Sequence, residues 1–164
     1  MDLQLKTLSF KKLFCNYSTY EQEFDYGGVL GRAEFINGFI CHKFVCFKKG
    51  NSEETAAVNL TEIESKKEKS VGNRILKYIG INLRLGNKIN DMKEIEKIYG
   101  VPVSIDDCFI DMLRYHYLVS PDLFICLGIK TSNNKLIHVE IINDSEVISE
   151  IIDVRRNMTL RNKR

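Results

Sequence analysis

The chain has no tryptophan, only two prolines, and no apolar run of the roughly 18 residues that a membrane-spanning helix needs. Its first residues, MDLQLKTLSFKKLF, lack the basic start, apolar stretch and small-residue cleavage site of an export signal. We therefore expect a cytoplasmic protein that does not enter a membrane. With 164 residues and 44% hydrophobic side chains, it can bury one core, which predicts a single domain over 1–164.

Motifs for catalysis and metal binding are also missing. The sequence contains no GxSxG nucleophile elbow, no GxxxxGKS/T phosphate loop, and no CxxC or HExxH metal motif. The nearest approach to a metal site is Cys41-His42 with Cys46, but an odd separation on a strand turns the two thiols to opposite faces. We expect no enzyme, no metal and no cofactor.

Two other chemical interpretations stay open. The five cysteines, an odd number in apolar segments, are expected to be small core residues. Cys126 could nevertheless meet His116 or His138 on one sheet face, with Glu140 orienting the imidazole, as in a hydrolase or a small-ligand binder. The tail at 155–164 holds five basic residues and no acid, which would allow nucleic-acid binding. It has no aromatic residue to stack on a base, so nucleic acid is not the expected partner.

Strands dominate the predicted N-terminal part of the chain. Three segments have strand character: Val29–Ile36, Phe39–Phe47 and Thr55–Leu60. Asn37-Gly38, between the first two, favours a two-residue type I′ turn that would pair Ile36 with Phe39. The polar stretch that follows the third, Thr61–Asn73, is predicted to be an exposed loop.

Aromatic residues gather in a polar, loop-like segment ahead of these strands: Tyr17, Tyr20, Phe24 and Tyr26. Such side chains either anchor a protein interface or cover the edge of a core, and the sequence does not decide between the two. The glycines that follow, Gly27, Gly28 and Gly31, predict a turn rather than a phosphate loop.

A helix is predicted between Asp91 and Tyr99. Asp91 can cap it and Glu94 can complete a capping box, while Gly100 and Pro102 end it. Apolar residues recur along one face at helical spacing: Met92, Ile95, Ile98 and Tyr99.

Three further strands are predicted as an antiparallel meander: Leu113–Val119, Leu123–Lys130 and Lys135–Ile142. Alternation assigns one face to the core: Leu113, Tyr115, Tyr117, Ile125, Leu127, Ile137, Val139 and Ile141. The opposite face mixes charged, imidazole and aromatic groups: Arg114, His116, Phe124, Cys126, Lys130, His138 and Glu140. We expect this second face to be the functional surface. Residues 147–154 fit either a helix or an edge strand.

Together these elements predict an α+β domain in which an antiparallel β-sheet carries one main amphipathic helix, with an N-terminal β-hairpin region. Its expected parts are a strand-rich lobe (1–60), an exposed loop (61–73), the helix with the meander (74–154) and a basic tail (155–164).

The order of a Y-G-x-P helix end, R-Y-x-Y, LFICLGIK and NNKLIHVEI resembles the helix-plus-sheet repeat of the beta-lactamase-inhibitor-protein-like group. The matching positions are Gly86, Glu94, Ile95, Gly100, Pro102, Tyr115, Tyr117, Leu136 and Ile137. They lie within Leu83–Ile142 and mark helix ends and turns. In its size and its Asn-, Ile- and Lys-rich composition, the chain also resembles cytoplasmic immunity proteins of bacterial toxin–immunity pairs, such as those of contact-dependent growth inhibition.

That resemblance implies a non-enzymatic mechanism, in which the protein binds a cognate toxin domain and occludes its active site. The candidate partner-binding residues are Asp106, Asp107, Asp111, Arg114, His116, His138, Glu140, Tyr20 and Tyr26. We expect Asp106–Asp111 to be an acidic loop. If the toxin is a nuclease, its carboxylates could imitate phosphates and steer association. The toxin's activity and the oligomeric state do not follow from the sequence.

Overall fold

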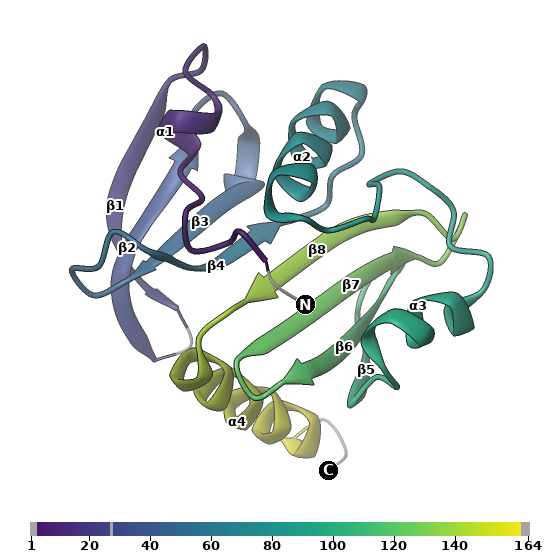
Figure 1. Cartoon of the computed structure of the whole chain (residues 1–164). Coiled ribbons are helices and arrows are strands. Elements are labelled where there is room, and N and C mark those ends of the chain that lie inside the picture. The colour runs from purple at the N-terminus through teal and green to yellow at the C-terminus, as the bar shows by residue number, and fades with distance from the viewer. Residues whose placement is uncertain (1–2, 27, 162–164) are drawn as a thin grey trace.

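The computed structural model describes residues 3–26 and 28–161, with the backbone alone for 108 and 154–161. In this part of the chain, eight strands form one antiparallel sheet in the order β1-β2-β3-β4-β8-β7-β6-β5 (Figure 1). The prediction of an α+β fold with an antiparallel sheet is therefore confirmed. The strands are β1 (Thr19–Tyr26), β2 (Val29–Ile36), β3 (Phe44–Lys49), β4 (Thr55–Leu60), β5 (Ser104–Phe109), β6 (Met112–Ser120), β7 (Leu123–Lys130) and β8 (Leu136–Ile142).

Helices accompany the sheet: α1 (Phe10–Leu13), the 3-10 helix η1 (Ile40–His42), α2 (Lys66–Ile79), α3 (Met92–Tyr99) and α4 (Ser145–Arg161). The single helix that was predicted is α3. One main helix was too few, because α2 and α4 are both longer. Residues 147–154, which fitted either a helix or a strand, lie in α4. Within the described residues, no helix combines the length and the apolar character that crossing a membrane would require.

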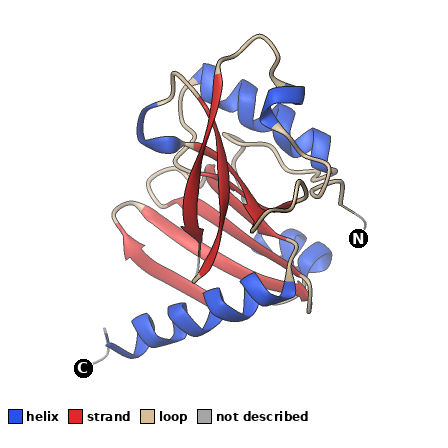
Figure 2. Ribbon diagram, turned by 90° about the vertical axis from the view of Figure 1, so that its left-hand side faces the viewer, coloured by secondary structure: helices blue, strands red, loops and turns tan. Residues whose placement is uncertain are grey.

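Each face of the sheet carries an apolar core. The α2/α3 core holds side chains of both helices with Leu5, Leu8 and Phe10 of the N-terminal segment, against one face of the sheet. The α4 core holds side chains of α4 with residues of β2, β3, β4, β7 and β8 on the other face. Figure 2 shows α4 running along the lower end of the strongly twisted sheet. Because successive strand residues point to opposite faces, β2, β3, β4, β7 and β8 contribute to both cores.

The predicted loop at 61–73 is wrong beyond residue 65, where α2 begins. Ser65 and Glu68 form a complete capping box, in which the Ser65 hydroxyl accepts from the Glu68 N–H and the Glu68 carboxylate accepts from the Ser65 N–H. Burial opposes ionisation of Glu68, but the N–H groups of Ser65 and Glu64, with the Lys43 ammonium, outweigh it and lower the pKa of Glu68. The charged outer face of α2 hid its buried stripe in the sequence: Val71, Ile75, Leu76 and Ile79.

The tight hairpin predicted at Asn37-Gly38 is also wrong. A type I′ turn needs positive φ at both central residues, and only Gly38 has it. The strands instead pair Phe35 with Val45, and a longer connection through η1 leads from β2 to β3. Phe39 lies in that connection, where its ring packs 4.6 Å from the Phe44 ring.

The second half of the chain is closer to expectation. Asp91 caps α3 by accepting from the Lys93 N–H, and Gly100 ends the helix with a φ of 85°. Glu94 does not complete a capping box and pairs with Lys97 instead. The meander of β6, β7 and β8 is confirmed.

The structure differs from the prediction in the register between β7 and β8 and in its two edge strands. The register shifts after Gly128, so Ile129 pairs with Leu136. Leu136, not Ile137, therefore joins the α2/α3 core. The segment predicted as an acidic loop, Asp106–Asp111, lies in the edge strand β5 as far as Phe109, and only its end forms a turn. Most of the aromatic segment ahead of β2 forms the other edge strand, β1.

Ser65→Ala removes half of the capping box and is expected to lower the free energy of unfolding by about 1 kcal/mol. Chemical denaturation measures the change. Ser70→Ala is the matched control, because Ser70 is exposed within the same helix, where alanine is the better helix former. Equal stability of the Ser65→Ala variant and the wild type would show that the capping box does not hold α2 in place.

Candidate functional site

The sheet face that was expected to be the functional surface is largely buried, and of its named residues only Arg114 and Lys130 keep partly exposed side chains. His116, His138 and Glu140 are only 2–3% exposed. Cys126 and Phe124 on the same face belong to the α4 core. Sequence alternation identified the face correctly, but it could not show that α4 and the curled N-terminal strands cover it. In this fold, the two histidines and the glutamate offer a partner protein no surface.

The same face does bring three predicted residues together as the β7–β8 cluster: Cys126, His138 and Glu140. The thiol, one imidazole nitrogen and a carboxylate oxygen all lie within 4.8 Å of one another. Cys126 stands opposite Glu140 on β8 and opposite His116 on β6. Because Cys126 is fully buried, a substrate has no access to its thiol. This burial counts against the hydrolase interpretation.

The three candidate aspartates have different surroundings. Asp106 on β5 accepts from the Arg114 guanidinium at 2.6 Å, and that guanidinium lies 4.0 Å from the centre of the Phe109 ring. Asp107 on β5 is exposed. Asp111 follows β5 with a φ of 58° and accepts from the Thr131 hydroxyl at 2.6 Å.

Asp111 holds two turns together. Besides Thr131, it accepts from the N–H of Ser132 at 2.7 Å and from the Ser132 hydroxyl at 2.8 Å. The Thr131 and Ser132 donors lower the pKa of Asp111. The Asp111 side chain thus links the β5–β6 turn to the β7–β8 turn by hydrogen bonds. The sequence did not indicate this structural role.

Tyr20 and Tyr26 cover the edge of the core, one of the two roles considered for them. Both lie on β1 and stack on phenylalanine rings of the sheet, Tyr20 on Phe35 at 5.0 Å and Tyr26 on Phe47 at 4.0 Å. The Tyr20 hydroxyl bonds to Nδ1 of His42 at 2.9 Å. The Tyr26 hydroxyl donates to Oε1 of Glu140 and so reaches the β7–β8 cluster.

The cysteines are not all core residues. Cys46 and Cys126 are buried, whereas Cys15 and Cys41 are exposed, and the side chain of Cys108 lies outside the described part. Burial raises the pKa of Cys46 to about 12, so its thiol stays protonated at neutral pH. The Cys41-His42 pair lies in η1 rather than on a strand, so the predicted strand geometry for this group is wrong.

Exposed apolar side chains concentrate along one edge of the sheet. Of the eleven exposed large hydrophobic residues in the described part, seven lie between 98 and 118. We call this set the β5 rim: Ile98, Val101, Val103, Ile105, Phe109, Ile110 and Leu118. β5 is the last strand of the sheet, so half of its backbone N–H and C=O groups face outward. The candidate partner-binding residues that were named from the sequence are mostly polar or charged, so they do not include this apolar rim.

An open depression of about 420 Å³ adjoins the rim at Ile110. Its lining includes three carboxylates, Glu62, Glu64 and Asp111, and one ammonium, Lys130. Lys130 forms ion pairs with Glu64 and, at 3.7 Å, with Asp111. One positive charge against three negative ones leaves the depression acidic.

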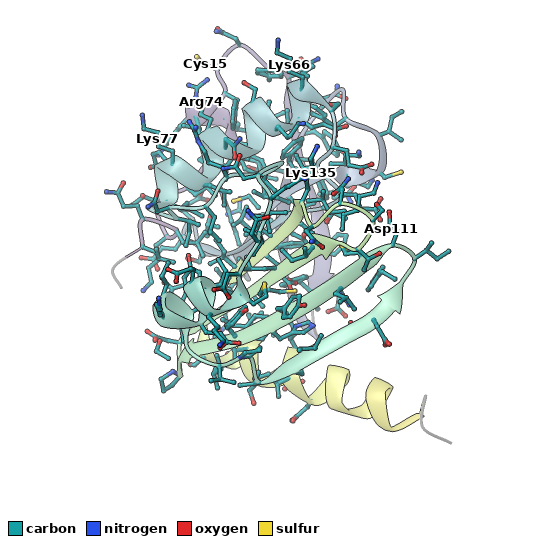
Figure 3. The ribbon with its side chains drawn as sticks, turned by 90° about the vertical axis from the view of Figure 1, so that its right-hand side faces the viewer. Cys15, Lys66, Arg74, Lys77, Asp111 and Lys135 are labelled. Carbon is teal, nitrogen blue, oxygen red and sulfur yellow. The ribbon has the colours of Figure 1, made fainter. Side chains whose placement is uncertain are left out.

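The basic side chains of α2 lie elsewhere on the molecule. Figure 3 shows Lys66, Arg74 and Lys77 along α2, well separated from Asp111 at the tip of the β5–β6 hairpin. The β5–β6 hairpin tip therefore lies apart from this basic helix.

Comparison with protein-family models, with curated proteins and with solved structures finds no match for this chain. The resemblances to the beta-lactamase-inhibitor-protein-like group and to immunity proteins therefore stay predictions.

Asp111→Asn is expected to lower the melting temperature at pH 7, because it removes the charge that the Thr131 and Ser132 donors stabilise. A carboxylate whose pKa is lowered by folding stabilises the protein above its unfolded pKa, about 3.9, and loses that effect as pH falls. The difference from the wild type should therefore shrink below about pH 4. Asp107→Asn is the control, with no expected change. If the two variants melted alike at pH 7, the structural role of Asp111 would be wrong.

Proposed function

We propose that the protein binds another protein through the β5 rim, and that the partner is a toxin domain that it neutralises. The observation that supports this proposal is the concentration of exposed apolar residues on the edge strand β5 and in the segments beside it. Apolar patches of this kind on soluble proteins mark interaction sites, because water solvates them poorly. The inhibition requires no catalytic group, only occlusion of the toxin's active site.

The two sheet edges differ in a way that favours β5 as the docking edge. Natural proteins protect free edges with charged side chains, since an unpaired strand invites another strand to pair with it. β1 carries Glu21, Glu23 and Asp25 along its length. β5 also carries two carboxylates, but its Ile105 and Phe109 are exposed and further exposed apolar residues flank it on both sides. The apolar rings of β1, Tyr20 and Phe24, are less exposed, at 36–37%, and lie against rings of β2 and β3. An extended segment of the partner would add to β5 by backbone hydrogen bonds, with its apolar side chains on the rim.

The charges beside the rim indicate the chemistry of the partner. The acidic depression next to Ile110 would accept a lysine or arginine side chain. Asp107, exposed on β5, extends the negative surface toward the rim. A toxin domain with an exposed strand and adjacent basic groups fits this surface, as expected of an enzyme that acts on nucleic acid. Both partners would then meet in the cytoplasm.

Growth protection tests the proposal. The protein is co-expressed with the C-terminal domain of whatever protein is encoded immediately upstream of its gene, and cell survival and binding are measured. Ile105→Lys with Ile110→Lys places charge in the rim and is expected to weaken binding by about 30-fold or more, the loss of a central hot spot. Ile40→Lys is the matched control, because Ile40 is also an exposed isoleucine, 82% accessible, but lies in η1.

The proposal holds if the wild type and Ile40→Lys protect the cells and the rim variant does not. Protection by the rim variant would overturn the assignment of β5. Failure of the wild type to bind the domain would overturn the toxin as partner. A concentration-dependent dimer that only the rim variant abolishes would instead assign the rim to a second copy of the chain.

A further inference from the structure

We propose that the β7–β8 cluster, Cys126, His138 and Glu140, binds a divalent transition-metal ion, for which Zn²⁺ is the best fit. Thiolate, imidazole and carboxylate are the ligand types that zinc sites use. The three ligand atoms lie within 4.8 Å of one another. Zinc–ligand bonds of about 2.0–2.3 Å place ligands closer than this, so small side-chain rotations would close the site.

The strand register gathers these ligands, although their sequence spacing matches no metal motif. Cys126 and Glu140 are paired across β7 and β8, and His138 precedes Glu140 by two residues, on the same face. Gly128 on β7 is paired with His138. A Cβ at Gly128 would lie 2.6 Å from the His138 Cβ, so only glycine leaves room for the imidazole at this position.

Charge balance favours a divalent ion at this depth. All three side chains are at most 3% exposed, and a buried net charge is costly. A thiolate, a carboxylate and a neutral imidazole carry two negative charges, which a divalent cation cancels. Binding would release the Cys126 thiol proton to solvent. The occupied site would be neutral.

Groups around the cluster match the outer shell of a metal site. Ligating carboxylates and imidazoles in metalloproteins are held by further hydrogen bonds, which orient them. The Tyr26 hydroxyl donates to Oε1 of Glu140 and so orients this carboxylate. His116 is paired with Cys126 on the same face, and its Nε2 lies 4.0 Å from the Asp106 carboxylate. His116 is therefore the candidate for a fourth ligand, by its strand position.

The burial of the cluster makes this a structural site rather than a catalytic one. Catalytic zinc keeps an open position for water or substrate, whereas structural zinc is closed by its protein ligands. An ion here would link β7 to β8 and, through Tyr26, to β1. It would add stability to the fold without taking part in the binding proposed for the β5 rim.

Cobalt spectroscopy tests the site, because a thiolate bound to Co²⁺ gives a near-ultraviolet charge-transfer band that Zn²⁺ abolishes on displacement. Chelator-treated wild-type protein is expected to show this band at one Co²⁺ per chain, and Zn²⁺ should raise its melting temperature. Cys126→Ser should lose the band. Cys46→Ser, which alters a second buried cysteine outside the cluster, should retain it.

Two tyrosine variants distinguish the effect of orienting the Glu140 ligand from a general effect of altering β1. Tyr26→Phe removes the hydroxyl that holds Glu140 and is expected to weaken Zn²⁺ binding by about 10- to 100-fold, with the cobalt band retained. Tyr20→Phe alters the same strand but touches His42 instead, so its Zn²⁺ affinity should not change. A folded wild-type protein without the cobalt band, or a band that survives Cys126→Ser, would overturn the proposal whether or not the variants fold.

Discussion

The pairing of β4 with β8 joins the two halves of the chain and determines most of the architecture. Ala57 pairs with Ile142 and Leu60 with Val139, although 75 residues separate the end of β4 from the start of β8. This seam makes one continuous sheet from two four-stranded halves. It also aligns their faces, so that α2 and α3 cover one side and α4 packs on the other.

Both functional proposals follow from that arrangement. Because β4 and β8 pair in the middle of the sheet, β1 and β5 are its two edge strands. Both edge strands carry carboxylates, but exposed apolar side chains gather on and beside β5, which favours that edge for a partner strand. The seam also buries Glu140 beside Cys126 and within reach of Tyr26. Surface recognition and the candidate metal site thus occupy separate parts of the sheet.

The sequence predicted the elements whose signals are local. Asp91, Gly100 and the turns around β7 are local signals, and they identified α3 and the meander. Features that depend on distant contacts were missed. The stripe of α2 is broken up by lysines, and the exposure of a sheet face depends on whether the helix that follows β8 packs on it. The β7–β8 cluster was foreseen as residues on one face, but its burial depends on α4 and on β1.

Hydrogen exchange of the β5 backbone amides tests whether β5 is the docking edge for the partner. In the free protein, the outward N–H groups of β5 and β1 should both exchange rapidly, because neither edge has a neighbouring strand. Binding of the toxin domain should slow exchange along Ser104–Phe109 and leave Thr19–Tyr26 unchanged. Protection that appears on β1, or on neither edge, would contradict the account.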